Sequence, residues 1–181
     1  PVDGIYVYDD AVNEPFRDLG SVEHVLDEHD VVRSGESSIR MKPAGEEALY
    51  FYAGYPILTK EYEKLRLWVN GGAAGGQQLK LAFLAGGAPV KELSGDELFP
   101  DGVPAGQWTQ LEFRLPDLEL PNGLFDGLII AGTGGVQEEV YLDDIALVRK
   151  YVAPPKMIEL RTDKPELVLL PGEEYRVEAE T

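Results

Sequence analysis

The sequence has no cysteine, and it contains only two histidines and two methionines. Disulfide bonds and thiolate metal sites are therefore excluded. No apolar run approaches the roughly 20 residues that a membrane-spanning helix needs, so we expect no membrane insertion. The chain starts at Pro1 without a signal-peptide pattern, and we expect it to be a piece of a longer protein.

Positive charge is scarce as well. The 16 lysines and arginines face 33 aspartates and glutamates, which gives a formal net charge of −17. A field of that sign repels nucleic acid and anionic membranes, and neither is an expected partner. It also disfavours uronate-rich polysaccharides, unless metal ions bridge them. Solubility alone is the simpler explanation of the charge.

Long amphipathic helical patterns are absent too, and short alternating runs between turn residues take their place. In residues 65–70, Leu65, Leu67 and Val69 alternate with polar or aromatic neighbours, which is typical of a strand with one buried face. Residues 48–54 are apolar on both faces, so the pattern does not decide which of them point inward. The pattern as a whole predicts an all-β fold, a two-sheet antiparallel β-sandwich. Strands are expected at 4–10, 37–42, 48–54, 65–70, 78–84, 108–116, 127–132 and 139–148.

Two prolines, Pro154 and Pro155, interrupt the strand pattern near the end of the chain. Proline ends a strand and stiffens a linker, so we assign 1–150 to the sandwich module and 151–156 to a linker. Residues 157–181 begin a new strand pattern around a Pro-Gly turn. This segment resembles the opening strands of a bacterial immunoglobulin-like domain, and we expect a partial domain of that kind.

Two adjacent aspartates, Asp143 and Asp144, stand in the middle of the last strand of the module. Aspartate disfavours strands, and its burial as an unpaired charge is costly. The first strand ends at Asp9 and Asp10, and the Ser-Gly turn at 34–38 is a natural source of free carbonyl oxygens. The first and last strands of a sandwich commonly lie side by side, so Asp9 and Asp143 can meet above this turn. Calcium accepts such oxygen ligands; the alternative is a strand end whose aspartates face water.

The segments "VYDDA", "RSGESSIR", "LRLWVNGG" and "VYLDDIALV" follow one another in an order that resembles the jelly-roll carbohydrate-binding modules of extracellular bacterial polysaccharide-degrading enzymes. The similarity spans 2–149 and is to the calcium-stabilised superfamily around families four, nine, sixteen and twenty-two. It implies an extracellular location and a structural calcium ion, although the family often has Glu where this chain has Asp9. The implied ligands are Asp9, Asp143 and the turn at 34–38 with Gly35 and Ser38, and Asp10 and Asp144 are the substitutes if the register differs by one residue.

Flat aromatic faces beside planar polar groups are the general signature of a sugar-binding site. Trp68 and Trp108 lie on the non-core phase of their strands, and Arg66 and Gln110 are polar neighbours on the same phase. Packing is the alternative role for both tryptophans, and it is the favoured role for Trp108.

Tyr50 and Tyr52 share one face of their strand and are further candidates for sugar contacts. A site at the loop tips would instead shift weight to Tyr55 and residues 70–78. The sequence does not choose between the two locations. A site in a sheet groove would combine Tyr50, Tyr52, Arg66, Trp68 and Gln110.

No catalytic motif is present in the sequence. The glycine-rich run at 71–76 lacks the Lys and the Ser or Thr of a phosphate-binding loop, and no serine lies in a nucleophile elbow. Asp143 and Asp144 are expected to point to opposite faces of their strand, so they cannot flank one glycosidic bond. We therefore predict that the chain is not an enzyme, with a jelly-roll lyase or hydrolase as the minor alternative.

Together these features predict a non-catalytic polysaccharide-binding module of an extracellular bacterial multidomain protein. It would tether a neighbouring catalytic domain to a neutral plant-type glucan, mannan or xylan and so raise its effective concentration. The expected partners are a polysaccharide and the other domains of the same chain, and the expected cofactor is structural Ca²⁺. The second hypothesis is a structural or adhesive domain of a cell-surface protein that binds no glycan.

Overall fold

The computed structural model describes residues 2–151, 159–162 and 177–180. The chain divides into two compact units, Pro1–Lys150 and Tyr151–Thr181. Among the described residues, no helix has the length and the apolar character needed to cross a membrane.

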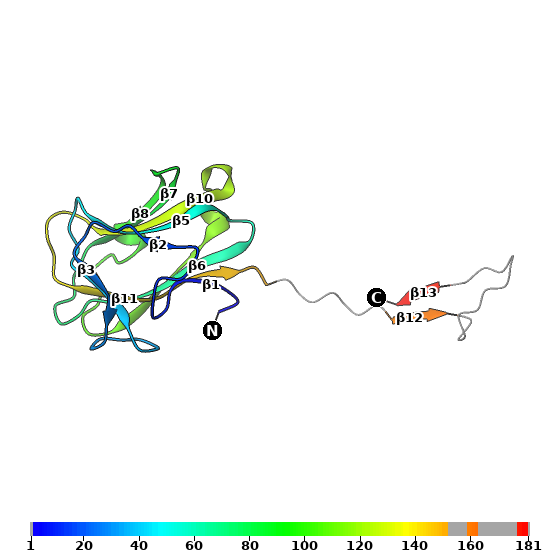
Figure 1. Cartoon of the computed structure of the whole chain (residues 1–181), viewed down its shortest axis with the longest axis horizontal. Helices are drawn as coiled ribbons and strands as arrows, with labels where there is room; N and C mark the ends of the chain where they lie inside the picture. Colours follow the sequence, from blue (N-terminus) through cyan, green and yellow to red (C-terminus); the bar gives the residue numbers. More distant parts are fainter. Residues whose placement is uncertain (1, 152–158, 163–176, 181) are drawn as a thin grey trace. The chain divides into compact units, whose positions relative to one another are not determined.

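The first unit consists of two antiparallel sheets (Figure 1). The six-stranded sheet contains β3 (His24–Glu28), β4 (Ser38–Met41), β11 (Val140–Arg149), β6 (Tyr62–Asn70) and β9 (Trp108–Arg114) in this order, and β1 (Gly4–Tyr8) also pairs with β11. The five-stranded sheet contains β2 (Arg17–Asp18), β5 (Ala48–Leu58), β10 (Leu124–Gly132), β7 (Leu79–Ala85) and β8 (Ala88–Ser94) in this order. Short 3-10 helices, η1 (Gly95–Glu97), η2 (Leu115–Leu118) and η3 (Pro121–Gly123), lie in the connections. The predicted all-β, two-sheet sandwich is confirmed.

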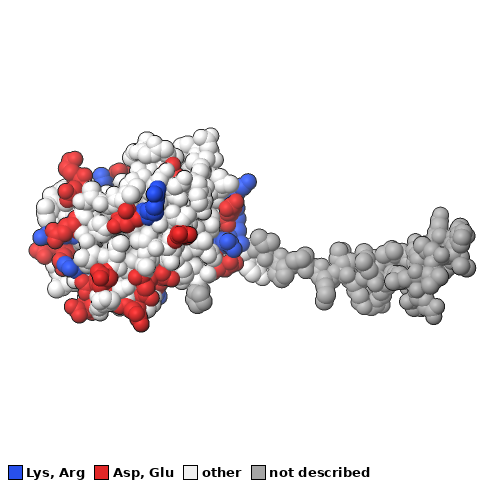
Figure 2. Space-filling model, in the orientation of Figure 1, with Lys and Arg blue, Asp and Glu red and all other residues white. Residues whose placement is uncertain are grey.

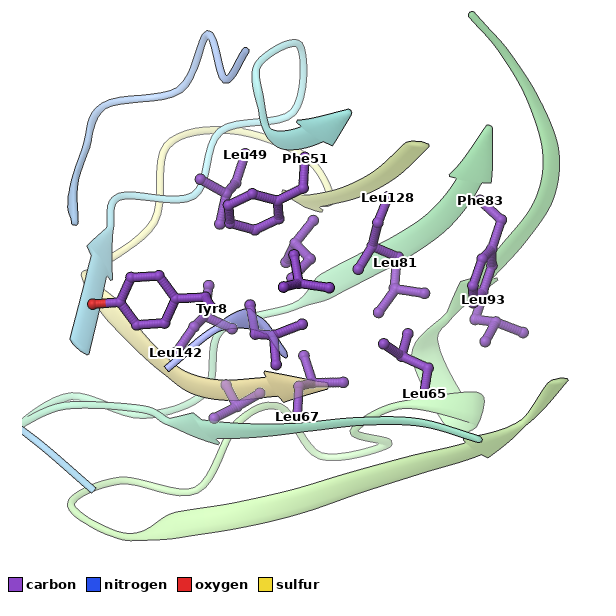
Figure 3. Close-up of a cluster of buried hydrophobic side chains, with 14 of the residues drawn as sticks. Tyr8, Leu49, Phe51, Leu65, Leu67, Leu81, Phe83, Leu93, Leu128 and Leu142 are labelled. Atoms are coloured by element: carbon purple, nitrogen blue, oxygen red, sulfur yellow. The ribbon is translucent and has the colours of Figure 1, made fainter. Parts of the chain in front are cut away.

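The core lies between the two sheets and follows the strand alternation. Leu65, Leu67 and Val69 of β6 are at most 1% exposed, and Figure 3 shows Leu65 and Leu67 in the same buried cluster as Leu49 and Phe51 of β5. The inward side of β5, which the sequence did not decide, is therefore the Leu49 and Phe51 side. Tyr50 and Tyr52 consequently lie on the opposite, outward phase.

The first and last strands of the unit lie side by side, as the sequence predicted. Gly4 pairs with Val148 and Tyr8 pairs with Ile145, while β4 continues along the same edge of β11 from Val140 to Leu142. The register of β11 shifts after Asp143. That shift marks the place where β1, β4 and β11 meet.

The second unit contains one described strand pair. β12 (Glu159–Thr162) and β13 (Val177–Glu180) are antiparallel, with Glu159 opposite Glu180. Most of the predicted linker and the Pro-Gly turn lie outside the described residues. The resemblance to an immunoglobulin-like domain therefore stays a prediction.

The core predicts a sharp difference between two leucine-to-alanine substitutions. Leu67 is 1% exposed and Leu19 is 50% exposed. We expect Leu67→Ala to lower the free energy of unfolding by about 2–5 kcal/mol, because it leaves a cavity between the sheets. Leu19→Ala is the control and should change it by less than about 0.5 kcal/mol. Urea titration followed by circular dichroism measures both; equal effects would contradict the assigned packing.

Candidate functional site

The carboxylate of Asp143 is the most deeply buried charge in the described part of the sandwich. The residue is 0% exposed, and its carboxylate faces the loop at 29–37 between β3 and β4, which we call the junction loop. Oδ2 accepts the backbone N–H groups of Arg33 at 3.0 Å and Ser34 at 3.2 Å, and Oδ1 accepts the N–H of Asp144 at 2.7 Å. Asp143 thereby fixes the junction loop to the last strand.

Asp144 turns toward the same loop. Its φ of 47° lies in the left-handed region, and this conformation breaks the alternation of β11. Its Oδ2 accepts the Ser34 hydroxyl at 2.7 Å and pairs with the guanidinium of Arg33. The prediction that the two aspartates point to opposite faces is therefore wrong, because it assumed regular extended geometry at a position that carries a bulge.

Asp10 holds the other end of the junction loop. Its Oδ1 accepts the N–H groups of Glu36 at 2.6 Å and Ser37 at 2.9 Å, and these bonds lower the pKa of Asp10. Gly35 lies directly against this carboxylate at a φ of 71°, and a Cβ there would collide with it. The first strand is thus tied to the loop through Asp10.

The remaining two predicted metal ligands have other partners. The Oδ1 of Asp9 accepts the N–H of Asp10 and the side-chain amide of Asn13, each at 2.9 Å. Ser38 is buried, and its hydroxyl donates to the carbonyl oxygen of Val31 at 2.7 Å. The hydrogen bonds of Asp9 and Ser38 therefore do not involve the carboxylates of Asp10 or Asp143.

The donor set at this junction does not fit calcium as the residues are arranged. Calcium needs 6–8 oxygen ligands, whereas Asp10 and Asp143 face backbone N–H groups and Asp144 faces a guanidinium. In the part of the chain that the structure describes, no three His, Cys, Asp or Glu side chains are placed to share a metal ion. Calcium binding therefore stays a prediction from the family resemblance.

A second candidate surface is the outward face of the five-stranded sheet. Tyr50 and Tyr52 project from it, with ring centroids 6.2 Å apart and planes tilted by 54°. A Cβ at position 127 would lie 2.8 Å from the ring of Tyr50, so this ring covers Gly127 on the neighbouring strand. The Arg17 guanidinium carbon lies 5.5 Å from the ring centroid of Tyr52. We call Arg17, Tyr50, Tyr52, Asp126 and Ile129 the tyrosine face.

Small and apolar residues form the floor of this face. Ala82 and Leu84 belong to the outward phase of β7, opposite Ile129 and Gly127, yet they are 0% and 7% exposed. At its margin, Oδ2 of Asp126 accepts the N–H of Gly86 at 2.9 Å, while its buried Oδ1 has no partner among the described residues. Aromatic rings, an apolar floor and a few polar groups are the features of a ligand-binding surface.

The other predicted ligand-binding residues lie on the six-stranded sheet. Trp68 is opposite Gln110 on the neighbouring strand, and Trp108 is opposite Asn70. Tyr50 and Tyr52 belong to the other sheet. The grouping of Tyr50, Tyr52, Arg66, Trp68 and Gln110 into one groove is therefore wrong, because strand phase predicts that a residue points outward but does not say from which sheet.

Trp68 has a partner within the protein. The guanidinium carbon of Arg33 lies 3.9 Å from the centroid of its ring. This stacked cation occupies a face of the indole that a sugar would need. Trp68 is therefore engaged by the junction loop.

The residues of the alternative loop-tip site, Tyr55 and 70–78, are not brought together either. Tyr55 is 54% exposed and precedes the turn that leads into β6 (Tyr62–Asn70), whereas residues 71–78 follow the end of that strand. A strand of that length spans about 30 Å. Gln77 is buried and donates to the carbonyl oxygens of Gly71 and Glu139, so this loop is held by its own contacts.

Several residues of these two surfaces were not singled out from the sequence, among them Gly127, Arg17 and Arg33. Gly127 had a usable signal, since a glycine inside a strand often marks a close approach of another group. Arg17 and Arg33 had no such signal, because each contacts a residue that is distant in the sequence. Arg17 contacts Tyr52, and Arg33 contacts Asp144.

Comparisons with known proteins add the following. No family model matches the chain. An endoglucanase of Dictyostelium discoideum is 28% identical over 150 residues, which are 79% of this chain and 21% of the endoglucanase. The chain thus spans about a fifth of the length of this curated relative.

Solved structures of similar fold include carbohydrate-binding modules. The CBM22-1 and GH10 modules of a Clostridium thermocellum endo-1,4-β-D-xylanase, complexed with xylohexaose, match with a TM-score of 0.55 and 15% identity over 84% of this chain and 30% of that one. A family 29 module complexed with mannohexaose matches with a TM-score of 0.51 and 10% identity over 81% of this chain and 92% of that one. At such identities the match shows the fold: this chain has the β-sandwich of carbohydrate-binding modules.

Burial of Asp143 predicts a pH dependence of stability. Burial raises its pKa from 3.8 to about 6, and the N–H bonds from Arg33, Ser34 and Asp144 offset part of that rise. The pKa of Asp143 is higher in the folded than in the unfolded protein, so protonation of this carboxyl group stabilises the fold. This stabilisation is fully present below about pH 4 and is lost as the pH rises through about 6. Between pH 7.5 and 5 the wild type should gain about 1–3 kcal/mol that Asp143→Asn does not gain.

Urea unfolding at a series of pH values, in EDTA, measures this difference. Comparing the two proteins removes the contribution of groups that titrate in both. Parallel pH curves for the wild type and Asp143→Asn would show that this carboxylate keeps an ordinary pKa.

Proposed function

We propose that this chain is a non-catalytic polysaccharide-binding module that binds glycan on the tyrosine face. The observation that carries the proposal is the Tyr50 ring lying over Gly127 beside Tyr52. A ring that is held against the sheet presents its other side as a fixed platform. The apolar C–H side of a pyranose packs on such a platform with little loss of side-chain entropy, because the ring is already positioned.

Polar groups around the platform would orient the sugar. The guanidinium of Arg17 donates hydrogen bonds, and the carboxylates of Asp126 and Glu92 accept them. Glu92 and Lys80 both lie on the outward phase of this sheet, Glu92 opposite Ala82 and Lys80 opposite Ala131. The tyrosine face and its surroundings on this sheet thus combine two cations with two acids, a balance that suits a neutral glycan chain.

The charge of the rest of the module supports the same substrate class. Figure 2 shows Asp and Glu side chains spread over the visible surface of the sandwich, with fewer Lys and Arg between them. The net charge of −17 opposes the approach of a polyanionic glycan. A neutral plant-type glucan, mannan or xylan is the substrate class that we propose.

The comparisons support the proposal at the level of fold. The xylanase modules and the family 29 module were solved with xylohexaose and mannohexaose, and the endoglucanase relative is much longer than this chain. We propose that this module tethers a catalytic domain of an extracellular, multidomain bacterial protein to its polysaccharide. The tether would raise the local substrate concentration without any new catalytic contact.

The acidic pair of β11 supports a binding role over a hydrolytic one. Asp143 is 0% exposed and Asp144 is 7% exposed. Their carboxylates accept hydrogen bonds from the junction loop. Glycoside hydrolysis needs two accessible carboxyl groups on either side of the bond. These two aspartates have a structural role.

The second candidate function is a structural or adhesive sandwich domain without a glycan ligand. The engagement of Trp68 by Arg33 favours it, because it withdraws a predicted sugar platform from the solvent. The two hypotheses differ in what they predict for the tyrosine face, and one set of variants separates them.

Tyrosine substitutions test the binding proposal. We expect Tyr50→Ala to weaken binding of xylan, glucomannan or β-glucan at least about tenfold, because stacking of a ring of this size contributes more than about 1.4 kcal/mol. The measurement is affinity gel electrophoresis against a panel of soluble glycans. Tyr55→Ala, in the same strand but 54% exposed, is the matched control. If no neutral glycan retards the wild type, the chain is a structural domain.

A glycine substitution tests the platform without removing a ring. At Gly127 a Cβ would lie 2.8 Å from the ring of Tyr50, so Gly127→Ala should displace this ring and weaken glycan binding about threefold to tenfold. The melting temperature should fall by only a few degrees, because the ring can move outward. Unchanged affinity would show that the sugar does not use the position of Tyr50.

A further inference from the structure

The side chain of Arg33 contacts both the acidic pair of β11 and the neighbouring indole of β6. Its guanidinium pairs with the carboxylate of Asp144 and lies 3.9 Å from the ring centroid of Trp68. Its own backbone N–H donates to Asp143 at 3.0 Å. One residue of the junction loop therefore contacts both acids of β11 and the indole of β6.

We propose that Arg33 is the built-in cation of this junction and makes it independent of metal ions. The junction joins β1, the junction loop and β11, and in this chain the guanidinium provides the positive charge that was expected from calcium. This proposal does not depend on glycan binding, because the tyrosine face belongs to the other sheet.

The charge balance at the junction supports this role. Three carboxylates, those of Asp10, Asp143 and Asp144, accept hydrogen bonds from residues 33–37. Backbone N–H groups carry partial positive charge but no formal charge. The ion pair with Arg33 supplies a full positive charge there.

Three other cations of the six-stranded sheet are paired elsewhere. Arg40 pairs with Glu28 and Glu139, Lys64 pairs with Glu112, and Arg114 pairs with Asp117. Arg66 lies opposite Ala146 near the acidic pair, but among the described residues the ion pair to Asp144 comes from Arg33. The geometry therefore assigns Arg33 to the junction.

The stacking on Trp68 explains why an arginine suits this position. Trp68 lies directly opposite Asp143 in the strand register, so its ring is next to the acidic pair. A planar guanidinium can stack on an indole and still direct its N–H groups at a carboxylate, whereas an ammonium group lacks this geometry. The side chain of Arg33 is 31% exposed, so Trp68 also shields it partly from solvent. A lysine at position 33 would keep the charge and lose the stack.

A divalent ion would have to displace these contacts. Calcium binds oxygen lone pairs, and one oxygen of each of the three carboxylates, Oδ1 of Asp10 and Oδ2 of Asp143 and Asp144, already accepts N–H or O–H donors. The wild-type junction should consequently gain nothing from calcium. Removal of Arg33 leaves the acids without their cation, and a divalent ion can then compensate for part of the loss.

Thermal unfolding of the wild type and Arg33→Gln, each in EDTA and in millimolar CaCl₂, tests the proposal. We expect the wild-type melting temperature to be the same in both buffers. Arg33→Gln should melt about 4–10 °C lower in EDTA, and calcium should restore part of that difference where sodium at equal ionic strength does not. Arg114→Gln, which removes an exposed ion pair of the same sheet, is the matched control and should leave the melting temperature nearly unchanged.

Tryptophan fluorescence provides a second measurement. In a Trp108→Phe background the emission comes from Trp68, since the sequence has two tryptophans. Arg33→Gln and Arg33→Lys should both increase acrylamide quenching of Trp68, because each removes the stacked guanidinium. Arg33→Lys retains the charge and is expected to fold, so it keeps this measurement informative if Arg33→Gln fails to fold.

Two results would overturn the proposal. The first is a wild-type melting temperature that falls in EDTA and returns with calcium, which would show that a metal ion holds the junction. The second is an Arg33→Gln protein that melts with the wild type and shows unchanged quenching of Trp68.

Discussion

The buried carboxylate of Asp143 is the interaction on which the rest of the sandwich depends. It accepts N–H groups from Arg33, Ser34 and Asp144, and so it holds the junction loop on the last strand. Without these bonds the carboxylate would be a desolvated, unpaired charge, which is among the most destabilising features that a core can contain. The loop, in turn, carries the contacts to Asp10 that fix the end of the first strand.

As a result, the outward sides of the two sheets carry different kinds of contact. The outward side of the six-stranded sheet is used for internal contacts, because Arg33 stacks on Trp68 next to the acidic pair. The outward side of the five-stranded sheet carries Tyr50 and Tyr52 without such a cover, apart from Arg17 over Tyr52. Under the proposed function, a fixed junction on one sheet and an open aromatic surface on the other would allow the module to bind glycan without being rearranged.

Much of the fold could be predicted from alternation, because Leu65, Leu67 and Val69 obey the same period in the sequence and in the core. The pairing of β1 with β11 also followed from the module's architecture. The sites were harder to predict. The alternation of side chains along a strand did not predict Asp144, because a residue in the left-handed region changes which face the following residues point to. The alternation also could not assign Trp68 and Tyr50 to different sheets, since strand order depends on long-range pairing.

At the bulge of Asp144, an unfavourable backbone conformation is offset by contacts with a loop that is distant in the sequence. A non-glycine residue in the left-handed region costs about 1–3 kcal/mol, and an aspartate tolerates it better than a branched or bulky residue does. The bulge brings both carboxylates of the pair to the same loop, where Ser34 and Arg33 provide donors. Regular geometry would leave one of the two acids without these donors. The two adjacent aspartates, which oppose a strand by propensity, are therefore what allows this strand to close the sandwich.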